Sequence, residues 1–139
     1  MAFSKIGVVG AGTMGNGIAQ AFAQAGFEVV MSDVAQAALD RALATISGSY
    51  DRLIKKEKMT AEQKAAALGR IKTATDLAAL KDADLVIEAA TENPALKFEI
   101  FQQLDRACPA GVILATNTSS ISITEIAAKT KRPAEVIGM

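Results

Sequence analysis

Apolar residues along the chain fall into two patterns, short continuous runs and regularly spaced positions. Runs rich in β-branched residues predict strands, whereas apolar residues three and four apart predict one face of a helix. The predicted strands are Lys5–Val9, Glu28–Ser32, 71–73, Leu85–Glu88, 112–115 and 135–139. Because these strands alternate with helices, the sequence predicts an α/β fold with a doubly wound parallel sheet and right-handed crossovers.

Outside the stretch between the second and third strands, the spacing predicts three helices. The first covers residues 13–25, with Gly26 at the position of a C-cap. The second begins with Asn93 as its N-cap and Pro94 as its first helical residue, and a short third helix covers residues 123–129. The buried stripe predicted for the second of these helices consists of Leu96, Ile100, Phe101 and Leu104.

A long helical hairpin is predicted between the second and third strands, at residues 36–58 and 61–68. Thr60 is a suitable N-cap for its second helix, and Glu62 lies in the first turn. The hairpin is longer than a crossover between parallel strands requires, so we expect it to project and cover a ligand or a partner surface. Two helices packed only on each other fit the pattern equally well. The apolar seam of the first helix is formed by Leu39, Leu43, Ile46, Tyr50 and Leu53.

The composition fits one domain and argues against a polyanionic partner. Half of the 139 residues are hydrophobic and 4% are aromatic, which suits helices packed closely on a buried sheet. Fifteen Lys and Arg residues balance fifteen Asp and Glu residues. Because there is no net positive charge and no basic tract with aromatic residues, we expect no nucleic-acid partner.

The sequence predicts a cytoplasmic protein without a membrane span. The first strand begins close to Met1, which leaves no room for a targeting segment, and no apolar run approaches membrane-spanning length. The single cysteine, Cys108, excludes an internal disulfide and a multi-cysteine zinc site. We interpret it as a small, partly buried apolar residue, and no metal site is predicted.

A glycine-rich stretch joins the first strand to the first helix. In the pattern GxGxxG, Gly10 permits the tight turn, Gly12 lets the backbone approach a pyrophosphate, and Gly15 lets the helix lie close to the sheet. Thr13 and Met14 open the helix, where backbone amides and the positive end of the helix dipole face the phosphates. The sequence therefore predicts a Rossmann-type dinucleotide-binding domain.

Asp33 follows the second strand, at the position where dinucleotide-binding domains carry an acidic residue. Its carboxylate can accept both ribose hydroxyls of the adenosine, and its negative charge repels a 2′-phosphate. Val34 and Ala35 follow without a nearby arginine. The predicted cofactor is therefore NAD and not NADP. The alternative is that Gly12 and Asp33 serve only a turn and a strand end.

Three stretches together resemble the 3-hydroxyacyl-CoA dehydrogenase family. They are residues 10–15 (GAGTMG), 84–90 (DLVIEAA) and 117–124 (NTSSISIT). The resemblance covers essentially the whole chain, in order and at the family's spacing, and is greatest to bacterial 3-hydroxybutyryl-CoA dehydrogenases. It implies interconversion of an L-3-hydroxyacyl-CoA and a 3-ketoacyl-CoA by hydride transfer with NAD.

The resemblance also implies that residues 1–139 are the NAD-binding domain alone. The chain has no histidine, the side chain that most often moves protons near neutral pH. In the family the strand at 136–139 runs into a histidine base, then a glutamate and a helical C-terminal domain through which subunits associate. We therefore expect a fragment that binds NAD but lacks the catalytic base, from a homo-oligomeric enzyme.

Several site residues follow from the resemblance alone. Glu92 and Lys97 match an acidic and basic pair near the nicotinamide half of the cofactor, although the sequence by itself favours an exposed ion pair at a helix start. Ser119 matches the serine that hydrogen-bonds the substrate oxygen at C3, and Asn117 lies beside it near the nicotinamide. Without the family, this polar run would be an ordinary helix-capping turn.

The resemblance places the coenzyme A moiety of the substrate against the long helix. Ser49 and Lys56 match positions that contact coenzyme A, whose phosphates a lysine can meet. By sequence alone both residues belong to a solvated helix face. The acyl-CoA substrate is thus an expectation that depends on the family.

Two other functions compete with this hypothesis. The first is the NAD-binding domain of another β-hydroxyacid dehydrogenase that acts on a free acid; Asp33 and the motif from Asn117 to Ser120 argue against it. The second is a stand-alone nucleotide-sensing domain without enzymatic activity. An apolar strand at the very end of the chain argues against such a complete domain.

Overall fold

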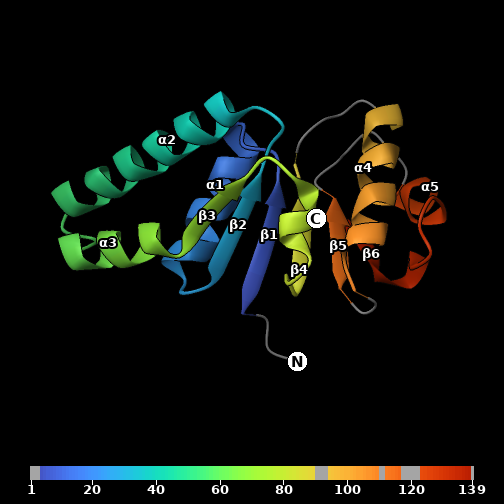
Figure 1. The fold of residues 1–139 in the computed structure, drawn as a ribbon. Helices are drawn as coiled ribbons and strands as arrows, with labels where there is room; N and C mark the ends of the chain where they lie inside the picture. The colour runs from blue at the N-terminus through green and yellow to red at the C-terminus, as the bar shows by residue number, and fades with distance from the viewer. Residues whose placement is uncertain (1–3, 90–93, 110–111, 117–122, 139) are drawn as a thin grey trace.

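The computed structural model describes residues 4–89, 94–109, 112–116 and 123–138. Six parallel strands form one sheet in the order β3-β2-β1-β4-β5-β6 (Figure 1). The strands are β1 (Lys5–Val9), β2 (Glu28–Ser32), β3 (Ile71–Ala74), β4 (Leu85–Glu88), β5 (Ile113–Thr116) and β6 (Val136–Gly138). This arrangement confirms the predicted doubly wound parallel sheet.

Helices flank the sheet on both faces. They are α1 (Thr13–Gln24), α2 (Gln36–Lys55), α3 (Ala61–Gly69), α4 (Pro94–Ala107) and α5 (Ile123–Ala128), with short 3-10 turns η1 (Leu77–Leu80) and η2 (Pro133–Glu135). All five α-helices were predicted, and Pro94 is the first helical residue of α4 as expected. The prediction missed both 3-10 turns. It also placed β5 one residue too early and began β6 at Glu135, which lies in η2.

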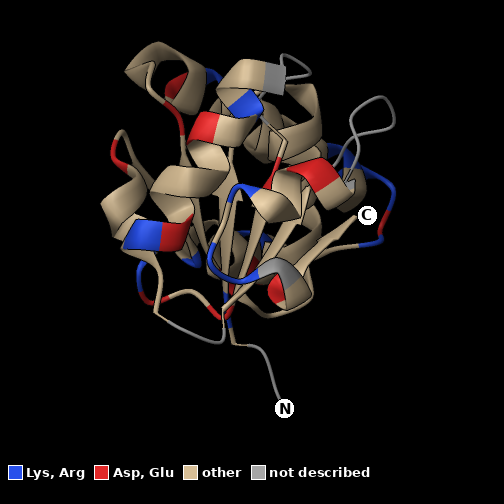
Figure 2. Ribbon diagram, turned by 90° about the vertical axis from the view of Figure 1, so that its right-hand side faces the viewer, with Lys and Arg blue, Asp and Glu red and all other residues tan. Residues whose placement is uncertain are grey.

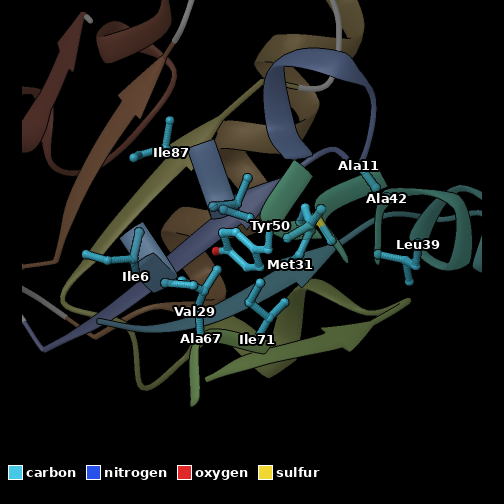
Figure 3. Close-up of a cluster of buried hydrophobic side chains, with 14 of the residues drawn as sticks. Ile6, Ala11, Val29, Met31, Leu39, Ala42, Tyr50, Ala67, Ile71 and Ile87 are labelled. Atoms are coloured by element: carbon cyan, nitrogen blue, oxygen red, sulfur yellow. The ribbon is translucent and has the colours of Figure 1, made fainter. Parts of the chain in front are cut away.

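Two apolar clusters fill the two sides of the sheet, because successive strand residues point to opposite faces. One cluster packs Ile6, Val8 and Met31 against α1, α2 and α3 (Figure 3). The other packs Val86 and Leu114 against η1, α4 and α5. The carboxyl ends of all strands therefore form one common edge between two helical layers.

The α2–α3 hairpin packs on the body of the domain as well as on itself. The apolar seam of α2 is buried at Leu39, Ile46 and Tyr50. The Tyr50 hydroxyl donates a 2.7 Å hydrogen bond to the Gln20 carbonyl in α1. Burial raises the pKa of Tyr50, although nearby Arg70 opposes this. The alternative of two helices packed only on each other is therefore wrong. The turn between α2 and α3 lies beyond the β3 edge of the sheet (Figure 1).

The ends of the hairpin helices follow sequence signals only in part. Thr60 caps α3 as predicted, and its partner is Gln63 in a reciprocal capping box. At the end of α2, Glu57 adopts a left-handed conformation with φ of 60°. Gly26 takes the corresponding place after α1, with φ of 104°. The same local geometry is thus built once from glycine and once from glutamate.

The buried face of α4 differs from the prediction. Phe101 and Leu104 are fully buried as expected, but Leu96 is 46% exposed and Ile100 is only partly buried. The position one turn before Phe101 is taken by Lys97, which is fully buried. Leu96 and Ile100 instead lie on the neighbouring face of the helix, where they line a cavity described below.

Arg132 holds the end of α4 against the start of β5. Its guanidinium forms an ion pair of 2.7 Å with Asp105 and donates hydrogen bonds to the carbonyls of Asp105, Cys108, Pro109 and Val112. Although burial alone would raise it, the pKa of Asp105 is lowered by the Lys131 amide and by Arg132. Cys108 is buried as predicted, and burial raises the pKa of its thiol.

The distribution of charged residues and the character of the helices agree with the balanced composition. Lys and Arg positions are interspersed with Asp and Glu positions along the ribbon (Figure 2). Among the residues that the structure describes, no helix combines the length and apolar character that crossing a membrane requires.

Candidate functional site

The turn after β1 has the geometry that the glycine pattern predicts. Gly10 adopts φ of 106°, a left-handed conformation that glycine takes without strain, and its amide donates to the Ser32 carbonyl at 2.7 Å. A Cβ atom at Gly15 would lie 1.8 Å from the Gly10 carbonyl oxygen. Gly15 therefore allows α1 to approach the turn after β1, whereas the sequence predicted a close approach to the sheet.

Open space adjoins Gly12 at the start of α1. A Cβ at Gly12 would meet no atom within 4 Å, and Gly12 as N-cap has no side chain to cap the helix. The amides of Thr13 and Met14 belong to the first helical turn, whose donors have no partner within a helix. Such a helix start attracts a phosphate group through both hydrogen bonding and the helix dipole.

Asp33 is held in place at the carboxyl end of β2. One carboxylate oxygen accepts from the Ala11 amide at 3.0 Å, and the other accepts from the Ala35 amide at 2.9 Å. Each oxygen keeps a further lone pair that can accept from a hydroxyl group. Asp33 is thus a rigid acceptor beside the glycine turn, on the strand adjacent to β1.

A cavity of about 600 Å³ opens at this edge of the sheet. Such a volume is within the range of small-molecule and cofactor sites. The cavity lies beside the end of β1, where the strand order reverses, as ligand sites of doubly wound sheets do. Its lining consists of Val9, Gly10, Ser32, Asp33, Val34, Thr75, Asp76, Leu77, Leu96, Glu99, Ile100 and Gln103.

The lining of this cavity fits the adenosine half of a dinucleotide. Asp33 offers acceptors for ribose hydroxyls, and Val34, which is 94% exposed, faces solvent beside it. Leu96 and Ile100 of α4 add apolar side chains to the same lining, and these suit an aromatic base. Sequence reasoning missed Asp76 and Leu77. Their position two and three residues after β3, at the carboxyl edge of the sheet, was the signal that could have found them.

Lys97 lies inside the protein, on the side of α4 that faces the sheet. Its ammonium donates to Glu88 at 2.5 Å and to the Thr116 hydroxyl at 3.2 Å, and all three side chains are fully buried. We call Glu88, Lys97 and Thr116 the buried cluster. The sequence alternative of an exposed ion pair is therefore wrong for Lys97. Glu88 could have been found, because strand alternation places it with Val86 on the α4 side.

Among the predicted site residues that the structure describes, Gly10 and Asp33 alone line the cavity. Glu92, Asn117 and Ser119 lie outside the described residues, so their roles stay predictions. On α2, Ser49 accepts a hydrogen bond from Arg52 at 2.9 Å, and Lys56 is exposed at the C-cap. Neither of these two residues lines the cavity, and their contact with coenzyme A also stays a prediction.

Comparison with known proteins decides the family. A family model described as "3-hydroxyacyl-CoA dehydrogenase, NAD binding domain" matches residues 5–139. The chain belongs to this family. Its fold and its glycine turn are those of an NAD-binding domain, and NAD is its cofactor.

The chain spans about half or less of the length of the similar proteins it matches. A 3-hydroxybutyryl-CoA dehydrogenase of Clostridioides difficile is 46% identical over 97% of the chain, which covers 48% of that protein. A 3-hydroxyadipyl-CoA dehydrogenase of Escherichia coli is 45% identical over 96% of the chain and 28% of its own length. The crystal structure of (S)-3-hydroxybutyryl-CoA dehydrogenase from Ralstonia eutropha shares 55% identity with a TM-score of 0.97, over 99% of this chain and 49% of that one.

Proposed function

We propose that this chain is the NAD-binding part of an enzyme that interconverts L-3-hydroxyacyl-CoA and 3-ketoacyl-CoA, with 3-hydroxybutyryl-CoA as the substrate. The family match supports the reaction class, and relatives with that printed name support the acyl group. The single structural observation that carries the proposal is the cradle formed by the Gly10–Gly15 turn, the α1 amides and Asp33.

Each part of the proposed site has a separate task. The amides at Thr13 and Met14 hold the pyrophosphate, and Asp33 orients the adenosine ribose. Bound NAD supplies the hydride acceptor. Ser119 holds the substrate oxygen at C3, with Asn117 and Glu92 near the nicotinamide.

The substrate and the remaining catalytic groups extend the proposal beyond this chain. Ser49 and Lys56 hold coenzyme A along α2, where Lys56 is exposed. In the family a histidine removes the hydroxyl proton, and because this chain has no histidine, we place that base in another part of the enzyme. We place the whole enzyme in the cytoplasm as a homo-oligomer that associates outside this domain.

Titration calorimetry with NAD and NADP tests the cofactor site. We expect the chain to bind NAD more tightly than NADP. The Asp33→Asn variant should bind NAD about 10- to 100-fold more weakly, the loss expected for a charge-assisted hydrogen bond. It should bind NADP no more weakly than before, because the repelling charge is gone. Absence of NAD binding by the unaltered chain would refute the proposal.

The control for this variant is Asp40→Asn, which removes an exposed carboxylate of α2 that does not line the cavity. Its affinity for NAD should match that of the unaltered chain. Equal losses in both variants would mean that the Asp33 result reflects net charge and not a contact with ribose.

A substrate panel tests the reaction with the longer protein that carries this domain. It should oxidise L-3-hydroxybutyryl-CoA with NAD and leave free 3-hydroxybutyrate unchanged. The Ser119→Ala variant should lower kcat/KM by about 100-fold or more, the loss typical of one transition-state hydrogen bond. Turnover of the free acid in preference to the thioester would contradict the proposed substrate class.

A further inference from the structure

The buried cluster links three elements at the carboxyl edge of the sheet. Glu88 is the last residue of β4, Thr116 is the last residue of β5, and Lys97 lies in the first turn of α4. Besides the two bonds from Lys97, the Thr116 hydroxyl donates to Glu88 at 3.0 Å. Each pair of members is therefore joined directly. Together they attach the start of α4 to the ends of two neighbouring strands.

Stability alone does not account for such a cluster. Taking a carboxylate and an ammonium out of water costs free energy that their mutual attraction seldom exceeds. Apolar residues of similar size in their place often leave a protein as stable or more so. Apolar contacts, however, carry no direction, whereas a charged hydrogen bond fixes the relative position of its two partners. The cluster therefore fixes where the start of α4 lies.

The position of α4 matters for the cofactor cavity. Leu96 and Ile100 line the cavity, and Lys97 follows Leu96 directly in the chain. Lys97 does not line the cavity, and no part of its side chain reaches solvent. A shift of α4 over the sheet edge would move Leu96 and Ile100 relative to Asp33, which lines the same cavity.

We propose that Glu88 and Thr116 are positioning residues that act through Lys97, holding the α4 wall at the separation from Asp33 that the adenosine half of NAD requires. This inference rests on the proposed cofactor site. It assigns a role to Glu88 and Thr116, and it gives Lys97 a role that needs no contact with the cofactor. Each member then affects NAD binding although none of them touches the adenosine.

Calorimetry with NAD and with AMP, on the 139-residue chain, separates positioning from direct contact. The first variant, Thr116→Val, keeps both charges and the side-chain shape. We expect its affinity to fall about tenfold for NAD and by the same factor for AMP. Thr116→Ser, which restores the hydroxyl, should recover most of the affinity. If Lys97 instead contacts the nicotinamide half, Thr116→Val should leave AMP binding unchanged.

The second variant, Glu88→Gln with Lys97→Met, separates positioning from stability. Because both charges are removed together, we expect its urea midpoint to equal or exceed that of the unaltered chain. Its affinities for NAD and AMP should nevertheless fall about tenfold or more. Unchanged affinities would overturn the inference, as would losses that track a lowered urea midpoint.

Arg106→Met is the control, because Arg106 is an exposed cation on the same helix and does not line the cavity. Its NAD and AMP affinities should match those of the unaltered chain. If the unaltered chain binds neither ligand, the proposed cofactor site fails, and this inference fails with it. If the unaltered chain binds both and the cluster variants bind equally well, only the inference fails.

Discussion

Gly15 and Gly17 lie two residues apart on α1, yet their surroundings differ completely. A Cβ at Gly15 would meet the Gly10 carbonyl oxygen at 1.8 Å, whereas a Cβ at Gly17 would meet nothing within 4 Å. The contact at Gly15 is with backbone, which cannot rotate away as a flexible side chain can. At the scale of single residues, the glycine turn thus depends on the absence of a side chain at Gly15.

We expect Gly15→Ala to lower the free energy of unfolding by about 3 kcal/mol or more and to abolish measurable NAD binding, because α1 must move away from the turn. The matched Gly17→Ala variant should instead gain about 0.5 to 1 kcal/mol from the higher helix propensity of alanine. Urea unfolding and NAD titration measure both effects. Equal behaviour of the two variants would contradict the close contact.

Residues in local motifs could be predicted from sequence, and residues in long-range contacts could not. The glycine turn and Asp33 follow from strand, turn and helix signals within about one βαβ unit. The sequence by itself favoured an exposed position for Lys97, because the partners that hold it inside, Glu88 and Thr116, lie 9 and 19 residues away. The spacing of apolar residues favours Leu96 for the buried face of the helix. It does not show that Lys97 has buried polar partners on neighbouring strands.

Two helices end in the same motif with different residues. After α1, Phe27 donates to the Phe22 carbonyl and Gly26 donates to the Ala23 carbonyl. The rings of Phe22 and Phe27 also pack edge to face, with centroids 5.5 Å apart. After α2, the amides of Glu57 and Lys58 make the corresponding bonds. Both ends are Schellman motifs, in which glycine is the favoured left-handed residue.

We therefore expect opposite effects from two substitutions. Gly26→Ala should lower the free energy of unfolding by about 1 to 2 kcal/mol, a purely conformational loss, since no atom lies within 4 Å of its Cβ position. Glu57→Gly should raise it by up to about 1 kcal/mol by relieving the left-handed conformation. Thermal and urea unfolding measure both changes, and a loss in the Glu57 variant would be inconsistent with strain at that position.

At the scale of elements, the helices and strands could be predicted from the hydrophobic pattern, and the short 3-10 turns could not. The strands β1, β2 and β4 were predicted with their observed bounds, whereas β3 and β5 each differ from the prediction by one residue. The 3-10 turns η1 and η2 span four and three residues, too few to show a period. The α2–α3 hairpin was predicted, although α2 ends at Lys55 and not near residue 58. Its packing on α1 through Tyr50 depends on a contact 30 residues away and was not predicted.

At the scale of the whole molecule, the described residues form two apolar clusters separated by the sheet, and the cofactor cavity lies at their shared edge. Arg132 and Asp105 stabilise the second cluster by joining the end of α4 to the loop before β5. This polar contact spans 27 residues of sequence, and it was not predicted for the same reason as the buried cluster.

The Arg132–Asp105 pair should make stability depend on acidity. The pKa of Asp105 is lower in the folded state than in the unfolded state, where it is about 3.9. Its contribution to the free energy of unfolding is therefore fully present above the unfolded-state pKa. That contribution is lost as the pH falls through the lower folded-state pKa. Asp105→Asn should lower the free energy of unfolding by about 3 kcal/mol near pH 7. The difference in free energy of unfolding between this variant and the unaltered chain should become smaller below about pH 4.

Urea midpoints measured across pH test this dependence against Asp51→Asn. Asp51 also pairs with a lysine, Lys64, but its side chain is 61% exposed. Its removal should change the free energy of unfolding by no more than about 1 kcal/mol at any pH. A constant difference for the Asp105 variant down to about pH 3 would contradict the assignment.

The ion pair between Glu88 and Lys97 also constrains how the gene can vary. Replacing either residue alone leaves an unpaired charge in a space that water does not reach, and such single changes are strongly destabilising. A substitution that removes the charge of Glu88 or of Lys97 should therefore be retained only together with one that removes the other charge. We therefore expect positions 88 and 97 to change together among related sequences, even where exposed positions vary independently.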